Sequence, residues 1–139
     1  MVVRELIRCR GHALVSARHP TTFELTAEPH LTSAGDCIIG IGADRGAADL
    51  SEEFRAALRL KGAVMVTTLR CGGLEIVVRS EGHPGLTLDH PTDLVWRRSE
   101  HVCGRTIGVR SDCVARTLPR EFVERLRTGA ALEAELVVL

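Results

Sequence analysis

Residues Ile39–Arg59 read IGIGADRGAADLSEEFRAALR, and residues Ile107–Arg127 read IGVRSDCVARTLPREFVERLR. Aligned without a gap, the two stretches are identical at nine of 21 positions, where ordinary residue frequencies would give about one or two. The identical pairs are Ile39/Ile107, Gly40/Gly108, Asp44/Asp112, Ala47/Ala115, Leu50/Leu118, Glu53/Glu121, Phe54/Phe122, Leu58/Leu126 and Arg59/Arg127. The two stretches predict that the chain contains two copies of one structural unit.

A second pair of matching blocks lies upstream of these stretches, in the same order. The blocks are Arg8, Gly11-His12 and His19-Pro20-Thr21 in the first copy, and Arg79, Gly82-His83 and His90-Pro91-Thr92 in the second. Two independent blocks make coincidence a poor explanation. At 139 residues the chain has the length of one domain. We therefore expect a single domain over residues 1–139, with copy one at about 1–70 and copy two at about 71–139.

Each copy has the pattern of a βββαβ unit. The predicted strands are Glu5–Cys9, Thr22–Thr26, Cys37–Ala43 and Ala63–Leu69 in copy one, and Leu74–Arg79, Asp93–Arg98, Thr106–Ser111 and Leu132–Leu139 in copy two. Before the last strand of each copy, apolar residues recur at every fourth position, which is typical of a helix with one buried face. We predict Asp49 as the N-cap of the first helix, with Glu52 completing a capping box. For the second helix we predict Thr117 as the N-cap and Pro119 in the first turn.

One such unit leaves a sheet face half exposed, so the two copies must pack against or interleave with each other. The predicted fold class is therefore mainly β (α+β). Its internally duplicated βββαβ units form a pseudo-twofold β-sandwich or barrel with two covering helices. Gly62 and Gly129 follow the predicted helices, where a left-handed cap would need glycine. Cys71-Gly72-Gly73 predicts the hairpin that joins the copies.

Composition excludes several classes of function. The formal net charge is zero, which disfavours a nucleic-acid binder or a protein that binds anionic membranes. Charges within the first five residues argue against a secretory signal, and no apolar run approaches the roughly 20 residues of a membrane span. The five cysteines include no C-x-x-C pair, so we expect free thiols rather than a structural zinc cage. We expect a cytoplasmic protein.

The stretches His19–Thr26, Leu31–Gly40 and Ala43–Leu50 together resemble an archaeal family of small proteins known as domain of unknown function 371. The resemblance covers most of the chain and is most specific across Gly11–Leu50. It implies a mainly-β architecture of sandwich type with short helices. It carries no activity, cofactor or site residue.

The densest polar cluster of the sequence lies in copy one. Two imidazoles, a thiol and carboxylates there are suited to nucleophilic or acid–base catalysis; the candidate catalytic residues are His12, His19, Thr21, Asp36, Cys37 and Asp44. His12, His19 and Cys37 are also the ligand types of a transition-metal site. A structural alternative is open, because His83 and His90 hold the equivalent places: the imidazoles can close the Gly-His turns through backbone hydrogen bonds. Asp44 likewise recurs as Asp112, which favours a turn aspartate that bonds the backbone.

Copy two differs from copy one by an excess of arginine. Arg105 stands where copy one has Cys37, and Arg110, Arg116 and Arg120 stand where it has Gly42, Ala48 and Glu52. Guanidinium groups near a helix N-terminus suit a phosphate or a carboxylate. We therefore expect these four arginines, with Arg97 and Arg98 nearby, to bind an anionic ligand, unless they only form a solvated surface.

Two functions follow. The first is the binding of a small anionic ligand or partner segment in a cleft between the halves. The second is a small hydrolase-like enzyme that uses the copy-one cluster, with or without a transition metal. Gly40, Gly42 and Gly46 do not form a nucleotide loop, because the first two fall inside a predicted strand. With a single tryptophan and no tyrosine, the chain lacks the exposed aromatic residues on which single-stranded nucleic acid stacks.

Overall fold

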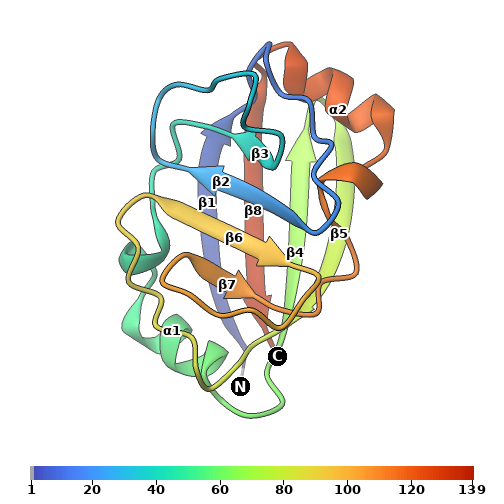
Figure 1. The fold of residues 1–139 in the computed structure, drawn as a ribbon. Coiled ribbons are helices and arrows are strands. Elements are labelled where there is room, and N and C mark those ends of the chain that lie inside the picture. The colour runs from blue at the N-terminus through green and yellow to red at the C-terminus, as the bar shows by residue number, and fades with distance from the viewer. Residues whose placement is uncertain (1) are drawn as a thin grey trace.

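The computed structural model describes residues 2–139 (Figure 1). Its first half contains β1 (Val3–Arg10), β2 (Thr22–Thr26), β3 (Ile38–Gly40), a short 3-10 helix (Ala47–Asp49), α1 (Glu52–Leu58) and β4 (Val64–Cys71). Its second half contains β5 (Leu74–Glu81), β6 (Asp93–Arg97), β7 (Thr106–Gly108), a short 3-10 helix (Ala115–Thr117), α2 (Arg120–Arg127) and β8 (Ala131–Val138). The five elements of the predicted βββαβ unit occur in that order in both halves, and a short 3-10 helix that the sequence did not predict precedes each α-helix. Descent of the halves from one duplicated gene remains a prediction.

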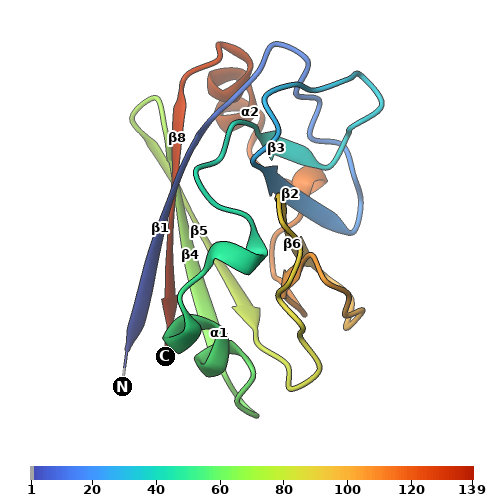
Figure 2. The same cartoon turned by 90° about the vertical axis from the view of Figure 1, so that its left-hand side faces the viewer.

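The strands form two four-stranded sheets that face each other, so the predicted mainly-β, α+β class is confirmed. The large sheet has the order β1-β8-β4-β5, and the small sheet has the order β3-β2-β6-β7 (Figure 2). Single backbone bridges, Arg10 to Ile41 and Glu81 to Val109, connect the two sheets at both edges. The architecture is therefore a sandwich whose edges are joined at one point each.

The two halves interleave. In the large sheet β8 lies between β1 and β4, and in the small sheet β2 pairs with β6 in antiparallel fashion. The Gly-His turn of each half packs on the helix of the other half, and a Cβ atom on Gly11 would lie 1.9 Å from the carbonyl oxygen of Leu126. The equivalent distance from Gly82 to the Leu58 carbonyl oxygen is 2.1 Å. Glycine is required at both turns because each backbone touches a helix end directly.

The core lies between the sheets. Phe23 and Trp96, on neighbouring strands of the small sheet, stack with ring centroids 4.5 Å apart and are fully buried. The helices α1 and α2 lie at opposite ends of the sandwich (Figures 1 and 2), and Phe54 and Phe122 on their inner faces are fully buried. The apolar spacing of both helices is thus explained by burial against one common core.

The predicted helix starts are wrong by two residues in each half. The N-cap of α1 is Ser51, whose side chain accepts a hydrogen bond from the Phe54 backbone N–H at 3.1 Å, and the N-cap of α2 is Pro119. Asp49 and Thr117 instead end the short 3-10 helices, and the Asp49 carboxylate accepts from the Gly46 backbone N–H. The polar residue that the sequence suggests as the helix cap therefore belongs to the 3-10 helix that precedes the α-helix.

The third strand of each half is shorter than predicted. It ends at Gly40 or Gly108, because the chain turns into the left-handed region two residues later, at Gly42 (φ 61°) and Arg110 (φ 50°). Gly62 (φ 83°) and Gly129 (φ 78°) have the left-handed conformation that their places after the helices predict. Neither helix within residues 2–139 is long and apolar enough to cross a membrane.

Candidate functional site

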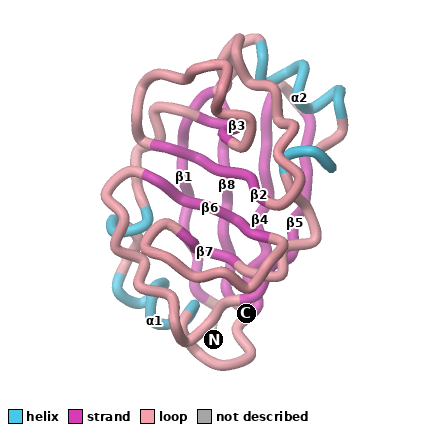
Figure 3. The backbone as a smooth tube through the Cα atoms, viewed as in Figure 1, coloured by secondary structure: helices cyan, strands magenta, loops and turns pink. Residues whose placement is uncertain are grey.

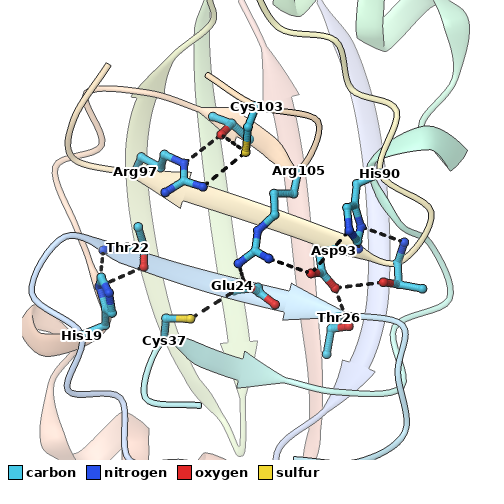
Figure 4. A network of polar contacts seen from close by, with 12 residues as sticks. His19, Thr22, Glu24, Thr26, Cys37, His90, Asp93, Arg97, Cys103 and Arg105 are labelled. Atoms are coloured by element: carbon cyan, nitrogen blue, oxygen red, sulfur yellow. Dashed lines mark hydrogen bonds and ion pairs between the residues drawn. The ribbon is translucent and has the colours of Figure 1, made fainter. Parts of the chain in front are cut away.

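A polar surface covers the outer side of the small sheet, and we call it the front face. Side chains alternate along β2 and β6, so Phe23, Leu25, Leu94 and Trp96 enter the core while their neighbours point outward. The front face comprises Thr22, Glu24, Thr26, Cys37, Asp93, Val95, Arg97, Cys103, Arg105 and Thr106, of which Figure 4 labels all but Val95 and Thr106. Four long connections, residues 11–21, 27–37, 82–92 and 98–105, surround it (Figure 3). Both halves of the chain therefore contribute to one surface.

Arg105 lies at the centre of the front face, between one carboxylate from each half. Its Nη2 is 2.9 Å from Glu24 Oε1, and its Nη1 is 3.4 Å from Asp93 Oδ2. The Glu24 and Asp93 side chains are 4% and 13% exposed, whereas the Arg105 side chain is 40% exposed. The guanidinium thus covers two nearly buried carboxylates and keeps an outer edge open to solvent.

Glu24 is the most perturbed acid of the front face. Burial raises the pKa of its carboxyl from 4.5 to about 7, and the negative charge of Asp93 acts in the same direction. The guanidinium of Arg105 and a hydrogen bond from Cys37 oppose the rise without cancelling it. Glu24 therefore exchanges a proton near neutral pH.

Asp93 is fixed from several sides. Its Oδ1 accepts hydrogen bonds from the hydroxyl groups of Thr26 at 2.8 Å and Thr92 at 3.0 Å, and His90 Nε2 is 3.9 Å from its Oδ2. These contacts hold the carboxylate in one orientation beneath Arg105.

A second guanidinium lies at the other end of β6. Arg97 donates from Nε to the Thr106 hydroxyl at 2.8 Å and from Nη2 to the Cys103 sulfur at 3.4 Å. Within residues 2–139 no carboxylate is in salt-bridge distance of Arg97. Burial raises the pKa of the Cys103 thiol, but hydrogen bonds from Thr106, the Arg105 backbone and Arg97 outweigh burial, so this pKa is lowered overall.

Cys37 meets Glu24 rather than a histidine. Its sulfur is 3.8 Å from Glu24 Oε1, and burial, followed by the charge of Glu24, raises the pKa of the thiol to about 11. Since the thiolate is the nucleophile, this environment keeps Cys37 unreactive at neutral pH. Cys37 therefore belongs to the front face as a half-buried neighbour of Glu24.

The histidines close turns, as the structural alternative from the sequence proposes. His12 Nδ1 accepts from the Leu14 backbone N–H at 3.0 Å, and His19 Nδ1 accepts from the backbone N–H groups of Thr21 and Thr22. His83 and His90 make the equivalent bonds in the second half. With Nδ1 as an acceptor, a neutral ring carries its proton on Nε2, so neither nitrogen offers a free lone pair to a metal.

The remaining candidates of copy one, Asp44, Asp36 and Thr21, each make separate local hydrogen bonds. Asp44 Oδ1 accepts from the Arg8 backbone N–H at 3.0 Å, and Asp112 repeats this bond to Arg79, which supports the turn-aspartate alternative. The Asp36 carbonyl oxygen accepts from two backbone N–H groups of the preceding loop, and the Thr21 hydroxyl contacts His19 Nδ1 at 3.4 Å. Within residues 2–139 no group of three or more His, Cys, Asp or Glu side chains could hold a metal ion.

The structure separates the four copy-two arginines. Only Arg105 belongs to the front face. Arg110 pairs with Glu81 at 3.4 Å and Glu100 at 3.3 Å, and Arg120 donates to the carbonyl oxygens of Ser16 and Ala17. Arg116 is exposed, and its backbone N–H donates to the His19 carbonyl oxygen. Arg98 is also exposed, outside the front face.

Glu24 and Asp93, the two carboxylates that hold Arg105, are not among the residues predicted from the sequence. A signal for both was present. Thr22, Glu24 and Thr26 alternate with apolar residues along one strand, which places a charge among hydroxyl groups on one face. Extending the comparison of the copies to this strand would also have aligned Thr22 with Asp93 and Glu24 with Val95.

Comparisons with known proteins identify a family but no activity. The chain matches the family described as a domain of unknown function (DUF371) over residues 7–139. It is also similar to an uncharacterized protein of Methanocaldococcus jannaschii, with 41% identity over 133 residues, which cover 96% of this chain and 98% of that protein. A match of this extent confirms the resemblance seen in the sequence. The chain belongs to the DUF371 family.

Proposed function

We propose that the front face binds a small anionic ligand, with Arg105 and Arg97 as its counter-charges. The single observation that supports this function most is the position of Arg105. One carboxylate from each half orients its guanidinium, yet 40% of the side chain is exposed. Each Nη atom of the guanidinium carries two N–H donors and has one carboxylate contact, so the group has donors to spare.

The charge balance of the front face favours an anion. Arg97 and Arg105 carry two positive charges, and Asp93 carries one negative charge. Glu24, with a pKa of about 7, is neutral in half of the molecules at that pH and charged in the other half. When Glu24 is protonated the site has a net charge of about +1, by this count of its four charged groups. The front face is therefore most attractive to an anion when it has taken up a proton.

The chemical class follows from the guanidinium groups. Arginine recognises carboxylates and phosphates through pairs of parallel hydrogen bonds, and it does so more strongly in a partly buried setting. The hydroxyl groups of Thr22 and Thr106 are buried and bonded to His19 and Arg97, so the guanidinium groups are the donors that face a ligand. We therefore assign a carboxylate or phosphate group to the ligand.

Binding is better supported than the hydrolase alternative. That alternative requires a reactive thiol and free imidazole nitrogens. Here the pKa of Cys37 is raised to about 11, and the Nδ1 atoms of His12 and His19 already accept backbone hydrogen bonds. The polar residues that do converge on the front face are arranged around a guanidinium rather than around a nucleophile.

Thermal unfolding with inorganic phosphate tests the proposal. At phosphate concentrations of about ten times Kd, ligand binding should stabilise the wild-type protein by about 1.4 kcal/mol. Because phosphate itself also gains negative charge between about pH 6 and about pH 8, Glu24 is tested by comparison with Glu24→Gln: relative to that variant, the stabilisation of wild type should be larger at the lower pH, on either side of the Glu24 pKa of about 7. Arg105→Met should abolish it, whereas the matched control Arg110→Met, which removes an exposed guanidinium elsewhere, should retain it.

Glu24→Gln gives a second test that keeps Arg105 paired with Asp93. This variant should still be stabilised by phosphate at both pH values, and any change between them then reports the titration of phosphate itself, because the protonatable group of Glu24 is gone. Equal stabilisation of wild type and Arg105→Met, or no stabilisation of wild type, would contradict the proposal.

A further inference from the structure

The outer side of the large sheet carries a second surface, independent of the front face. On the side away from the small sheet, no described element covers β1, β8, β4 and β5 (Figure 2). We call this surface the back face; its outward side chains are Arg4, Leu6, Arg8, Val66, Thr68, Arg70, Glu75, Val77, Arg79, Glu133, Glu135 and Val137. Val77 at its edge is 60% exposed. Leu6, Val66 and Val137 are half-buried among the charges, so the back face offers a partner both apolar and charged contacts.

Charges alternate in sign across one row of the back face. The strand register places Arg8, Glu133, Arg70 and Glu75 side by side, on β1, β8, β4 and β5 in that order. The row therefore reads plus, minus, plus, minus. A rotation of 180° about an axis that runs along the strands, between β8 and β4, exchanges β1 with β5 and β8 with β4. This rotation places each charge of the row opposite a charge of the other sign.

We propose that the back face binds a second copy of this chain, related by that twofold axis. In the resulting pair of facing sheets, Arg8 of one copy faces Glu75 of the other, and Glu133 faces Arg70. Each contact occurs twice, because the axis makes the interface self-complementary. Two aligned sheets packed face to face are a standard arrangement of β-sandwiches.

The other rows supply apolar contacts. The second row runs Leu6, Glu135, Thr68, Val77, so the rotation places Leu6 opposite Val77. In the third row it places Val66 opposite Val137. The same row sets Arg4 against Arg79, the one unfavourable pair in these three rows. Arg4 already turns toward Glu135 of its own chain, at 3.6 Å.

The size of the back face limits the strength of this contact. Four strands of eight residues, at about 4.8 Å between strands and 3.3 Å per residue, cover about 500 Å² per copy. Two such faces bury about 1,000 Å², near the lower limit for a specific interface. We therefore expect a dimer that dissociates on dilution.

Charge exchange between facing positions tests the geometry. Sedimentation velocity should show a monomer–dimer equilibrium of the wild-type chain between about 10 μM and about 1 mM, the range for a small interface. Arg8→Glu and Glu75→Arg should each weaken dimerisation by about tenfold or more, because each creates two like-charge contacts. The double variant R8E/E75R should restore the wild-type Kd.

Two further variants separate this interface from nonspecific association. Arg79→Glu removes the Arg4–Arg79 repulsion and should strengthen the dimer, while Arg116→Glu, the same change of charge outside the back face, should leave Kd unchanged. Thermal unfolding of every variant shows that the fold is kept. A wild-type monomer at all concentrations, or a double variant as weak as the single ones, would overturn the proposal.

Discussion

Replacing Glu24 with glutamine should flatten the dependence of stability on pH. The folded protein holds the proton of Glu24 more tightly than the unfolded chain, since burial and Asp93 raise the pKa from 4.5 to about 7. The contribution of Glu24 to the free energy of unfolding is therefore fully present below pH 4.5. It falls as the pH rises toward about 7, and the loss is complete above that pH.

The magnitude follows from the same values. Each tenfold change in proton affinity corresponds to about 1.4 kcal/mol, so the rise from 4.5 to about 7 corresponds to about 3 kcal/mol. The Glu24 side chain is only 4% exposed, so solvent screens this effect little. Glutamine keeps the shape of the protonated acid and cannot ionise.

Urea unfolding of wild type and Glu24→Gln across this pH range measures the effect. The difference between the two curves isolates Glu24 from the other titrating groups, and it should change by about 3 kcal/mol between pH 4.5 and about 8 in favour of the variant. Asp93→Asn removes the second cause of the raised pKa and should move the decline to lower pH. Parallel curves for wild type and Glu24→Gln would refute the reasoning.

Three further substitutions or reactions test other parts of the structure. Gly11→Ala should lower the free energy of unfolding by about 1–3 kcal/mol or more, because the new methyl group meets a helix carbonyl oxygen. The control Gly73→Ala should lower it by about 1 kcal/mol, because φ is 82° there but the space around the residue is open; equal losses in urea unfolding would contradict the packing. Arg110→Gly should be about 1 kcal/mol more stable than Arg110→Ala, the reverse of the usual order, because φ is 50° at this position and strains any residue with a Cβ atom. An alanine variant more stable than the glycine variant would contradict backbone strain at this position. Iodoacetamide should modify Cys103 before Cys37, because the pKa of the Cys103 thiol is lowered and that of the Cys37 thiol is raised. Peptide mapping over time measures the order, and earlier labelling of Cys37 would contradict the environments described for the two thiols.

Much of the fold could be predicted because the sequence states its pattern twice. Thr22–Thr26 was predicted with the bounds that the structure has, and Gly62 and Gly129 have the expected left-handed conformation. The helix starts could not be placed, because the short 3-10 turn before each helix uses the polar residue that looks like its cap. Local signals show that a turn begins there, but packing decides which turn continues.

The candidate site was harder to predict than the fold. The sequence showed that Arg105 replaces Cys37 between the copies, and both residues do lie on the front face. It could not show that Asp93, on a strand of the other half, reaches the same guanidinium as Glu24. That contact depends on the antiparallel pairing of β2 with β6, which places Glu24 beside Val95 and Thr26 beside Asp93.

The histidines left two interpretations open in the sequence for a physical reason. An imidazole beside glycine or proline is as suited to bond the backbone of a tight turn as to bind a metal, and spacing alone does not separate the two roles. His19 and His90 accept backbone hydrogen bonds at equivalent positions. Their repetition in both halves was the better guide.

Carbon-13 NMR of the Glu24 carboxyl, titrated with and without inorganic phosphate, examines the front face most directly. We predict an apparent pKa of about 7 for Glu24 without ligand, raised further when phosphate is bound, because a nearby anion favours the protonated acid. A carboxyl that titrates near 4.5 and does not respond to phosphate would contradict this prediction.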